Sequence, residues 1–206
     1  MRYMTGSYDS NRIGDRLKRI GVKAFDEALG VLSILTEGKH EITVRDLEMI
    51  GFADVYARLS SMTGSHICAA MHMDGDFEGE FTLIMQPSLA GWLLKCLNIP
   101  DELPDLSPRA RKTLLEIAGI CCGSFVTAIS DYIDMYIRAG ILSSQVDTLE
   151  TLLADQAMKF LETDCDTLYA RCDFSLPGDG HCGTILALPR MSSIERLNEV
   201  LASNKK

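Results

Sequence analysis

The 206-residue sequence predicts an α+β fold with a pseudo-two-fold internal repeat. One observation is the order helix, strand, helix, strand, strand, helix, which the hydrophobic patterns show twice along the chain. A second is that residues 82–87, Thr-Leu-Ile-Met-Gln-Pro, superpose on residues 184–189, Thr-Ile-Leu-Ala-Leu-Pro. Because repeated units of this kind share one core, we expect a single domain over residues 1–206. It would have a continuous β-sheet with two long helices packed on it.

The first half-repeat spans about residues 12–98. Its long helix is indicated by apolar residues at steps of three or four, and Asp74-Gly75-Asp76 between two β-prone runs is a strong hairpin signal. In chain order we expect a helix over 11–37, a strand over 41–50, a short helix over 52–60, strands over 65–73 and 77–86, and a helix from Pro87 to Leu97.

The second half-repeat spans about residues 107–203, after an acidic, proline-containing linker at 99–106. Ser107-Pro108 is a good helix entry, as N-cap and first helical residue. The long helix from there carries an apolar stripe of Leu114, Ala118, Cys122, Phe125 and Ile129. In chain order we expect a helix over 108–131, an extended stretch over 135–146, a helix over 148–161, a strand over 167–176, a turn over 177–180, a strand over 182–188 and a helix over 192–202.

Composition excludes several classes of protein. The formal net charge of −9 argues against nucleic-acid binding, which needs a clustered basic face. Apolar runs are too short for a membrane span of ~18 residues, and no signal peptide begins the chain. The seven cysteines are odd in number, show no CxxC spacing and lie mostly in apolar runs. We therefore expect reduced, packed cysteines in a cytoplasmic protein.

Other motifs suggest chemistry less strongly. His66 and Cys68 share one face of a strand, but such a pair supplies two metal ligands at most, and no second pair has metal-site spacing. Cys121 and Cys122 lack an activating base in the sequence pattern. The 177–180 turn joins two strands and opens no helix, so it is no phosphate loop. We expect no metal site and no cofactor of the protein's own.

Two stretches carry a resemblance to a known family. They are residues 19–29, Arg-Ile-Gly-Val-Lys-Ala-Phe-Asp-Glu-Ala-Leu, with the strand that follows, and residues 115–130 of the second long helix. Over about residues 12–203 the chain resembles the CheC-like family of chemotaxis phosphatases, the CheC/CheX/FliY superfamily. In that family each long helix carries the motif Asp/Ser-xxx-Glu-xx-Asn.

The resemblance implies a mechanism. The Glu would engage a lysine of a phosphorylated CheY-type response regulator, and the Asn amide would orient water for attack on the aspartyl phosphate. The regulator would supply Mg²⁺ and the phosphorylated carboxylate, so catalysis would rest on positioning and electrostatics. The spacing i, i+4, i+7 places the three side chains on one helix stripe, which we expect to face outward.

This sequence departs from that motif in both halves. The positions are occupied by Asp15, Arg19 and Val22 in the first half and by Lys112, Glu116 and Gly119 in the second. Neither Val22 nor Gly119 has an amide to orient water. Glu116 is retained, either to bind a partner or as half of an exposed i, i+4 pair with Lys112, worth ~0.3 kcal/mol. Asp15 is explained by the helix dipole as well as by function.

Three functions follow from the resemblance. The first is an active phosphatase that uses Glu116, with a contribution from Asp15. The second is a binding protein for the regulator, or for a CheD-type receptor deamidase, with weak or absent phosphatase activity. The third is a structural component like the flagellar switch, which the chain's end at Lys206 without a switch-assembly domain disfavours. Because the amide is missing twice, we expect the second, in a monomeric protein.

Overall fold

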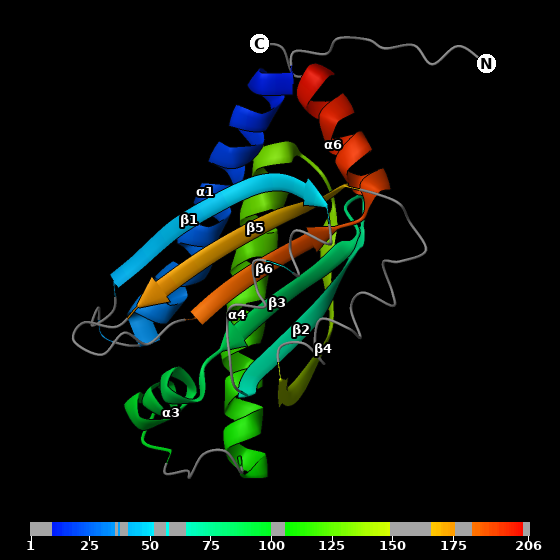
Figure 1. Ribbon diagram of the computed structural model, residues 1–206. Coiled ribbons are helices and arrows are strands. Elements are labelled where there is room, and N and C mark those ends of the chain that lie inside the picture. The colour runs from blue at the N-terminus through cyan, green and yellow to red at the C-terminus, as the bar shows by residue number, and fades with distance from the viewer. Residues whose placement is uncertain are drawn as a thin grey trace.

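The computed structural model describes residues 10–35, 37, 41–51, 57, 65–99, 106–148, 166–175 and 183–203. Within them it is an α+β protein in which long helices pack on an antiparallel sheet, as expected (Figure 1). The helices are α1 (Ser10–Leu35), α3 (Pro87–Cys96), α4 (Pro108–Ile133) and α6 (Met191–Ser203). The strands are β1 (Glu41–Gly51), β2 (Ser65–Gly75), β3 (Gly79–Met85), β4 (Ile137–Thr148), β5 (Asp166–Ser175) and β6 (Gly183–Pro189).

The six strands form one continuous sheet in the order β1-β5-β6-β3-β2-β4, and every neighbouring pair is antiparallel. If β1, β2 and β3 exchange places with β4, β5 and β6, the strand order is reversed. A reversed order describes the same sheet, so the exchange leaves the sheet unchanged. At the centre, β3 pairs with β6 and Leu83 lies opposite Ile185. The continuous sheet is therefore confirmed, and its strand order is the one that a two-fold repeat would produce.

The core lies between one face of the sheet and the two long helices, which run behind the sheet in Figure 1. Three phenylalanines join these layers. Phe125 of α4 lies 4.9 Å from Phe25 of α1 and 5.3 Å from Phe81 of β3, measured between ring centroids. All three are buried, and tilted aromatic pairs at such distances add to the stabilisation from burial alone. This cluster holds α1 and α4 against the central strand.

Helix α4 begins as the sequence predicts. The Ser107 side chain accepts a hydrogen bond of 3.2 Å from the Ala110 backbone N–H, and Pro108 occupies the first turn. The five residues of the predicted apolar stripe are all buried. By length and mean hydropathy α4 also resembles a membrane span, but half of its most apolar window is buried inside the protein. Its apolar composition is that of a core helix packed on α1 and the sheet.

The predicted β2–β3 hairpin forms, but β2 continues to Gly75 and β3 begins at Gly79 and not at residue 77, so the connecting turn is residues 76–78. The reason is that the Glu78 backbone is hydrogen-bonded elsewhere: its N–H donates to Ser193 Oγ (2.7 Å) and its carbonyl accepts from the Arg190 N–H (2.8 Å). Gly75 has a φ of +110°, and a Cβ there would lie 2.5 Å from the Tyr136 carbonyl oxygen. The turn therefore requires glycine.

The other predicted elements agree with the observed ones to within a few residues where the structure describes them. The predicted helices over 52–60 and 148–161, the turn over 177–180 and most of the linker over 99–106 lie outside the described residues.

Candidate functional site

The second-half motif positions lie on the N-terminal half of α4. Glu116 and Lys112 are both exposed, with 62% and 79% of their side chains accessible, and Lys112 Nζ lies 3.8 Å from Glu116 Oε1. This is the exposed i, i+4 pair that the spacing predicts. At such exposure the pair contributes little to folding, so Glu116 is displayed to solvent and available to a partner.

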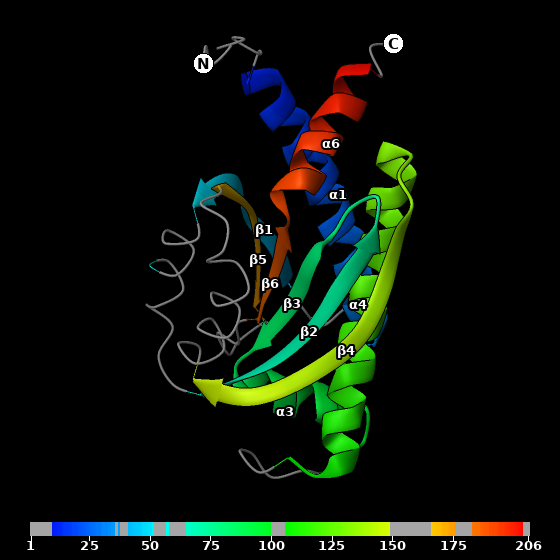
Figure 2. The same cartoon turned by 90° about the vertical axis from the view of Figure 1, so that its right-hand side faces the viewer.

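Gly119 is half-buried, which differs from the predicted outward stripe. A Cβ at this position would lie 3.8 Å from Leu142 Cδ2 and 4.0 Å from Met71 Cε, both ordinary contact distances. The cause is edge strand β4, which runs alongside α4 (Figure 2). The position of the missing amide is therefore at the junction of α4 and the sheet edge, with room for a side chain.

The first-half positions lie on α1. Arg19 is exposed and Val22 is half-buried, so this trio also faces outward only in part. Asp15 belongs to the helical backbone of α1, and its side chain is outside the described residues. A cation and an aliphatic side chain thus occupy the positions of the family's carboxylate and amide.

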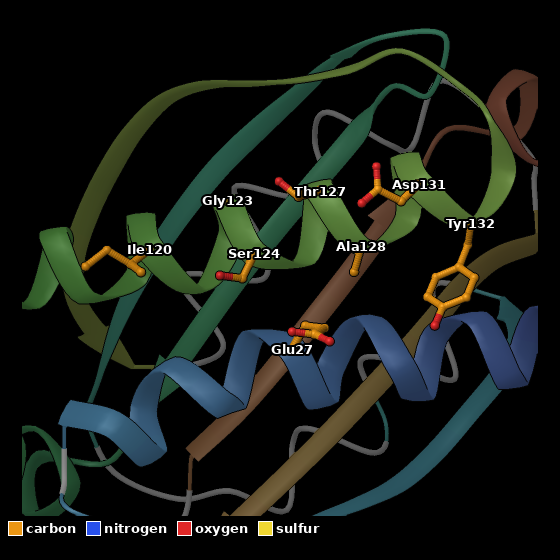
Figure 3. A pocket seen from close by; sticks show the side chains of 8 residues that line it. All are labelled: Glu27, Ile120, Gly123, Ser124, Thr127, Ala128, Asp131 and Tyr132. Carbon is orange, nitrogen blue, oxygen red and sulfur yellow. The ribbon is translucent and has the colours of Figure 1, made fainter.

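The fold does not bring the two motifs together. Lys23 of α1 places its Nζ 4.7 Å from the centroid of the Tyr132 ring, near the C-terminal end of α4. Farther along α1, Glu27 lies beside the middle of α4 (Figure 3). The two helices therefore run in opposite directions, and Arg19 and Glu116 belong to opposite ends of the helix pair. Each motif position would meet a partner separately.

Between these ends, α1 and α4 enclose an open groove with a volume of about 630 Å³. Figure 3 shows Ile120 at one end, Tyr132 at the other and the Glu27 side chain directed toward α4. From Ile120 to Tyr132 the groove follows about 18 Å of helix. Its lining is Glu27, Ile120, Gly123, Ser124, Thr127, Ala128, Asp131 and Tyr132.

This groove is not evident from the sequence. Two helices form it, and their register across the groove is not visible in either helical pattern alone. The available signal was a run of small residues in the middle of a long helix, at Gly123, Ser124 and Ala128.

Three cysteines have the character of core residues. Burial raises the pKa of Cys68, Cys121 and Cys122 to about 12 each, because a thiolate would be desolvated there. A thiol with so high a pKa is a poor nucleophile near neutral pH. The three are free thiols, so the interpretation of Cys121 and Cys122 as packed side chains is confirmed.

Among the described residues no group of three or more His, Cys, Asp or Glu side chains could hold a metal ion. His66 and Cys68 are both buried in β2. His181 and Cys182 lie outside the described part of the chain.

Comparison with known proteins identifies the fold. No protein-family model matches the chain. Among solved structures, FliY from Thermotoga maritima is similar with a TM-score of 0.70 and 16% identity, covering 94% of this chain and 98% of that one. The CheX–CheY–BeF₃–Mg²⁺ complex from Borrelia burgdorferi is similar with a TM-score of 0.59 and 17% identity, covering 84% and 97%. A CheC-like superfamily protein from Shewanella sp. PV-4 has a TM-score of 0.59 and 11% identity, covering 83% and 97%.

These similarities extend over nearly the whole of each known structure, at 11–17% identity. The fold of this chain therefore occurs in proteins with very different sequences. This chain has the CheC-like α+β fold that chemotaxis and flagellar proteins such as CheX and FliY share.

Proposed function

We propose that the protein is a CheC-like chemotaxis regulator that binds a phosphorylated CheY-type response regulator and hydrolyses its phosphate weakly or not at all. The observation that carries the proposal is the exposed Glu116 on α4, combined with the absence of an amide side chain at Gly119 and Val22. In this proposal, binding needs the carboxylate of Glu116 and hydrolysis needs the amide of the motif. This chain keeps the carboxylate and lacks the amide.

Two lines of support concern binding. The protein has the fold of CheX, and one similar CheX structure is a complex with CheY, BeF₃ and Mg²⁺. Glu116 is free to leave Lys112, because an exposed pair at 3.8 Å is held only weakly. Its carboxylate would then pair with a lysine or arginine of the regulator. Mg²⁺ would be bound by the regulator, and this protein would need no cofactor of its own.

Fast hydrolysis needs a side chain that positions the attacking water. A preorganised side chain that orients the reacting group supplies a rate factor on the order of 10² to 10³ in other enzymes. Val22 offers only methyl groups, and Gly119 leaves a space bordered by Leu142 and Met71. Neither residue places a hydrogen-bonding side chain where the amide would orient water. The expected product of the encounter is a complex, in which the regulator keeps its phosphate.

The test is a binding measurement with the CheY-type regulators of the same genome. Each would be purified with Mg²⁺, with and without beryllofluoride, and titrated with the parent protein and with Glu116→Arg. We expect one regulator to bind in its beryllofluoride form. Because like charges would then meet, Glu116→Arg should weaken it at least ~10-fold. Lys112→Ala removes the intramolecular partner and should leave affinity unchanged or raised. Binding by none of the regulators would contradict the proposal.

A flagellar-switch-like role is the second candidate. It is favoured by the similarity to FliY, whose TM-score of 0.70 exceeds the 0.59 of the CheX complex. Titration with the other switch proteins of the same genome separates the two, because only a switch component would form a stable complex with them in the absence of a regulator. A CheD-type deamidase is a further partner to titrate, and light scattering after size exclusion would test the predicted monomer.

A further inference from the structure

The α1–α4 groove contains a helical glycine, Gly123, at a position where packing within this chain leaves room for a side chain. A Cβ added at Gly123 would meet nothing within 4 Å, and the same is true of Gly30. Gly30 follows Glu27 by three residues and so lies on the same side of α1. Glycine in a helix interior is destabilising relative to alanine. Such positions are expected where an external group comes close to the backbone.

The charge of the groove favours a cation. Among the described residues that line it, Glu27 and Asp131 carry carboxylates and none carries a positive charge. Within the described part of the chain neither carboxylate makes an ion pair. Ser124 and Thr127 place hydroxyl groups between them. A lysine or arginine side chain entering the groove would therefore find two carboxylates and two hydroxyl acceptors.

The ends of the groove supply apolar contacts. Ile120 and Tyr132 are 48% and 47% exposed, which is unusual for side chains of their size. Lys23 already lies over the Tyr132 ring, so this chain's own cation occupies that end, and a partner's basic side chain would meet the carboxylates between the two ends. The length between the two ends matches a short protein segment better than a small metabolite.

The groove is also continuous with Glu116. The exposed stripe of α4 passes from Glu116 through Ile120 to Thr127 and Asp131 at steps of four or seven residues. A partner held at Glu116 would extend naturally over Ile120 and into the groove.

We infer that the groove is a second anchor for the response regulator, accepting a basic side chain flanked by small or apolar residues on a protruding segment. This inference rests on the proposed function and deepens it. Glu116 would contact the regulator near its phosphorylation site, and the groove would bind it independently of the phosphoryl group. This anchor would raise the affinity of the complex without contributing to hydrolysis of the phosphate.

The experiment fills the groove. Gly123→Leu adds a side chain where there is room for one, so the fold should persist with an unchanged or higher melting temperature. The matched control is Ser192→Leu, which places leucine at an exposed position of α6 away from the groove. Glu27→Gln combined with Asp131→Asn removes the two carboxylates. Titration would use the regulator that binds the parent, with and without beryllofluoride.

We expect Gly123→Leu to weaken binding of the beryllofluoride form at least ~10-fold, with the same factor for any binding of the free form, and Ser192→Leu to stay within about twofold. The charge-neutral double variant should weaken binding and reduce its dependence on salt. If Gly123→Leu stays within about twofold while Glu116→Arg abolishes binding, the groove inference is wrong and the proposed function stands. If the parent binds no regulator, both the groove inference and the proposed function are wrong.

Discussion

Leu83 of β3 pairs with Ile185 of β6 at the centre of the sheet, and these are the two residues that superposing Thr82 on Thr184 makes equivalent. The flanking residues pair crosswise, Thr82 with Leu186 and Ile84 with Thr184. A two-fold axis through the central pair would produce such a register. The internal repeat is a prediction from the sequence, and this register is the structural relationship that supports it most directly.

The phenylalanine cluster should dominate the stability of the helix layer. Phe125→Ala removes a buried ring that contacts both Phe25 and Phe81, so we expect a loss of about 3–5 kcal/mol in the free energy of unfolding. Phe125→Leu keeps most of the volume and should lose less than about 2 kcal/mol. Urea unfolding monitored by circular dichroism measures both. Equal losses would show that the stabilisation comes from the ring contacts and that restoring the volume recovers nothing.

The same substitution should have opposite effects at two glycines. Gly75→Ala forces a side chain onto a φ of +110° and into the Tyr136 carbonyl, and should destabilise by about 1–3 kcal/mol. Gly123→Ala adds a methyl group in open space within a helix, and should stabilise by about 0.5–1 kcal/mol. Thermal unfolding of the two variants side by side measures this contrast. Destabilisation by Gly123→Ala would mean that the groove is not open.

Local sequence signals predicted most of this fold because their causes are local. Ser107 begins α4 because its side chain accepts a hydrogen bond from Ala110, three residues away, and Gly75 adopts the positive φ of the β2–β3 hairpin because it has no side chain. The late start of β3 was not predictable, because it depends on hydrogen bonds between Glu78 and a distant helix.

The candidate site was predicted in part for a similar reason. Helical spacing was enough to expect the exposed pair of Lys112 and Glu116. The half-burial of Gly119 depends on Leu142 of β4, and the groove depends on the crossing of α1 and α4. Both arise from contacts between elements far apart in the sequence, which periodicity does not encode.

Ionisation of the buried thiols should leave the free energy of unfolding unchanged at neutral pH and lower it at high pH. Their ordinary pKa is 9.0 and burial raises it to about 12, so the unfolded chain loses protons that the folded chain keeps. Stability is therefore unaffected below pH 9 and falls as the pH rises from 9 toward 12. Each thiol contributes a slope of about 1.4 kcal/mol per pH unit there. Cys121→Ala should make the measured slope shallower.

Alkylation tests the same burial at single residues. With iodoacetamide at pH 8 and peptide mass spectrometry, we expect the half-buried Cys96 to react much faster than Cys68, Cys121 and Cys122. Comparable rates for Cys96 and Cys121 in the folded protein would contradict the burial of α4.

Restoring the missing amide should create activity. Gly119→Asn places its Cβ at ordinary contact distance from Leu142 and Met71, so the helix should accept it. We expect dephosphorylation of the bound regulator to rise at least ~10-fold, since an amide can then orient water. Gly119→Leu, which adds bulk without a hydrogen-bonding group, is the control. No rise with Gly119→Asn would mean that α4 does not present this position to the phosphate.

In the proposed function, the parent protein binds a phosphorylated regulator and hydrolyses its phosphate weakly or not at all. The decisive measurement is phosphate release from the phosphorylated regulator, at parent concentrations that saturate binding. We expect the rate to stay within about twofold of the regulator's own. A rate raised more than ~10-fold, and lost again in Glu116→Ala, would contradict it and establish an active phosphatase that works without the amide.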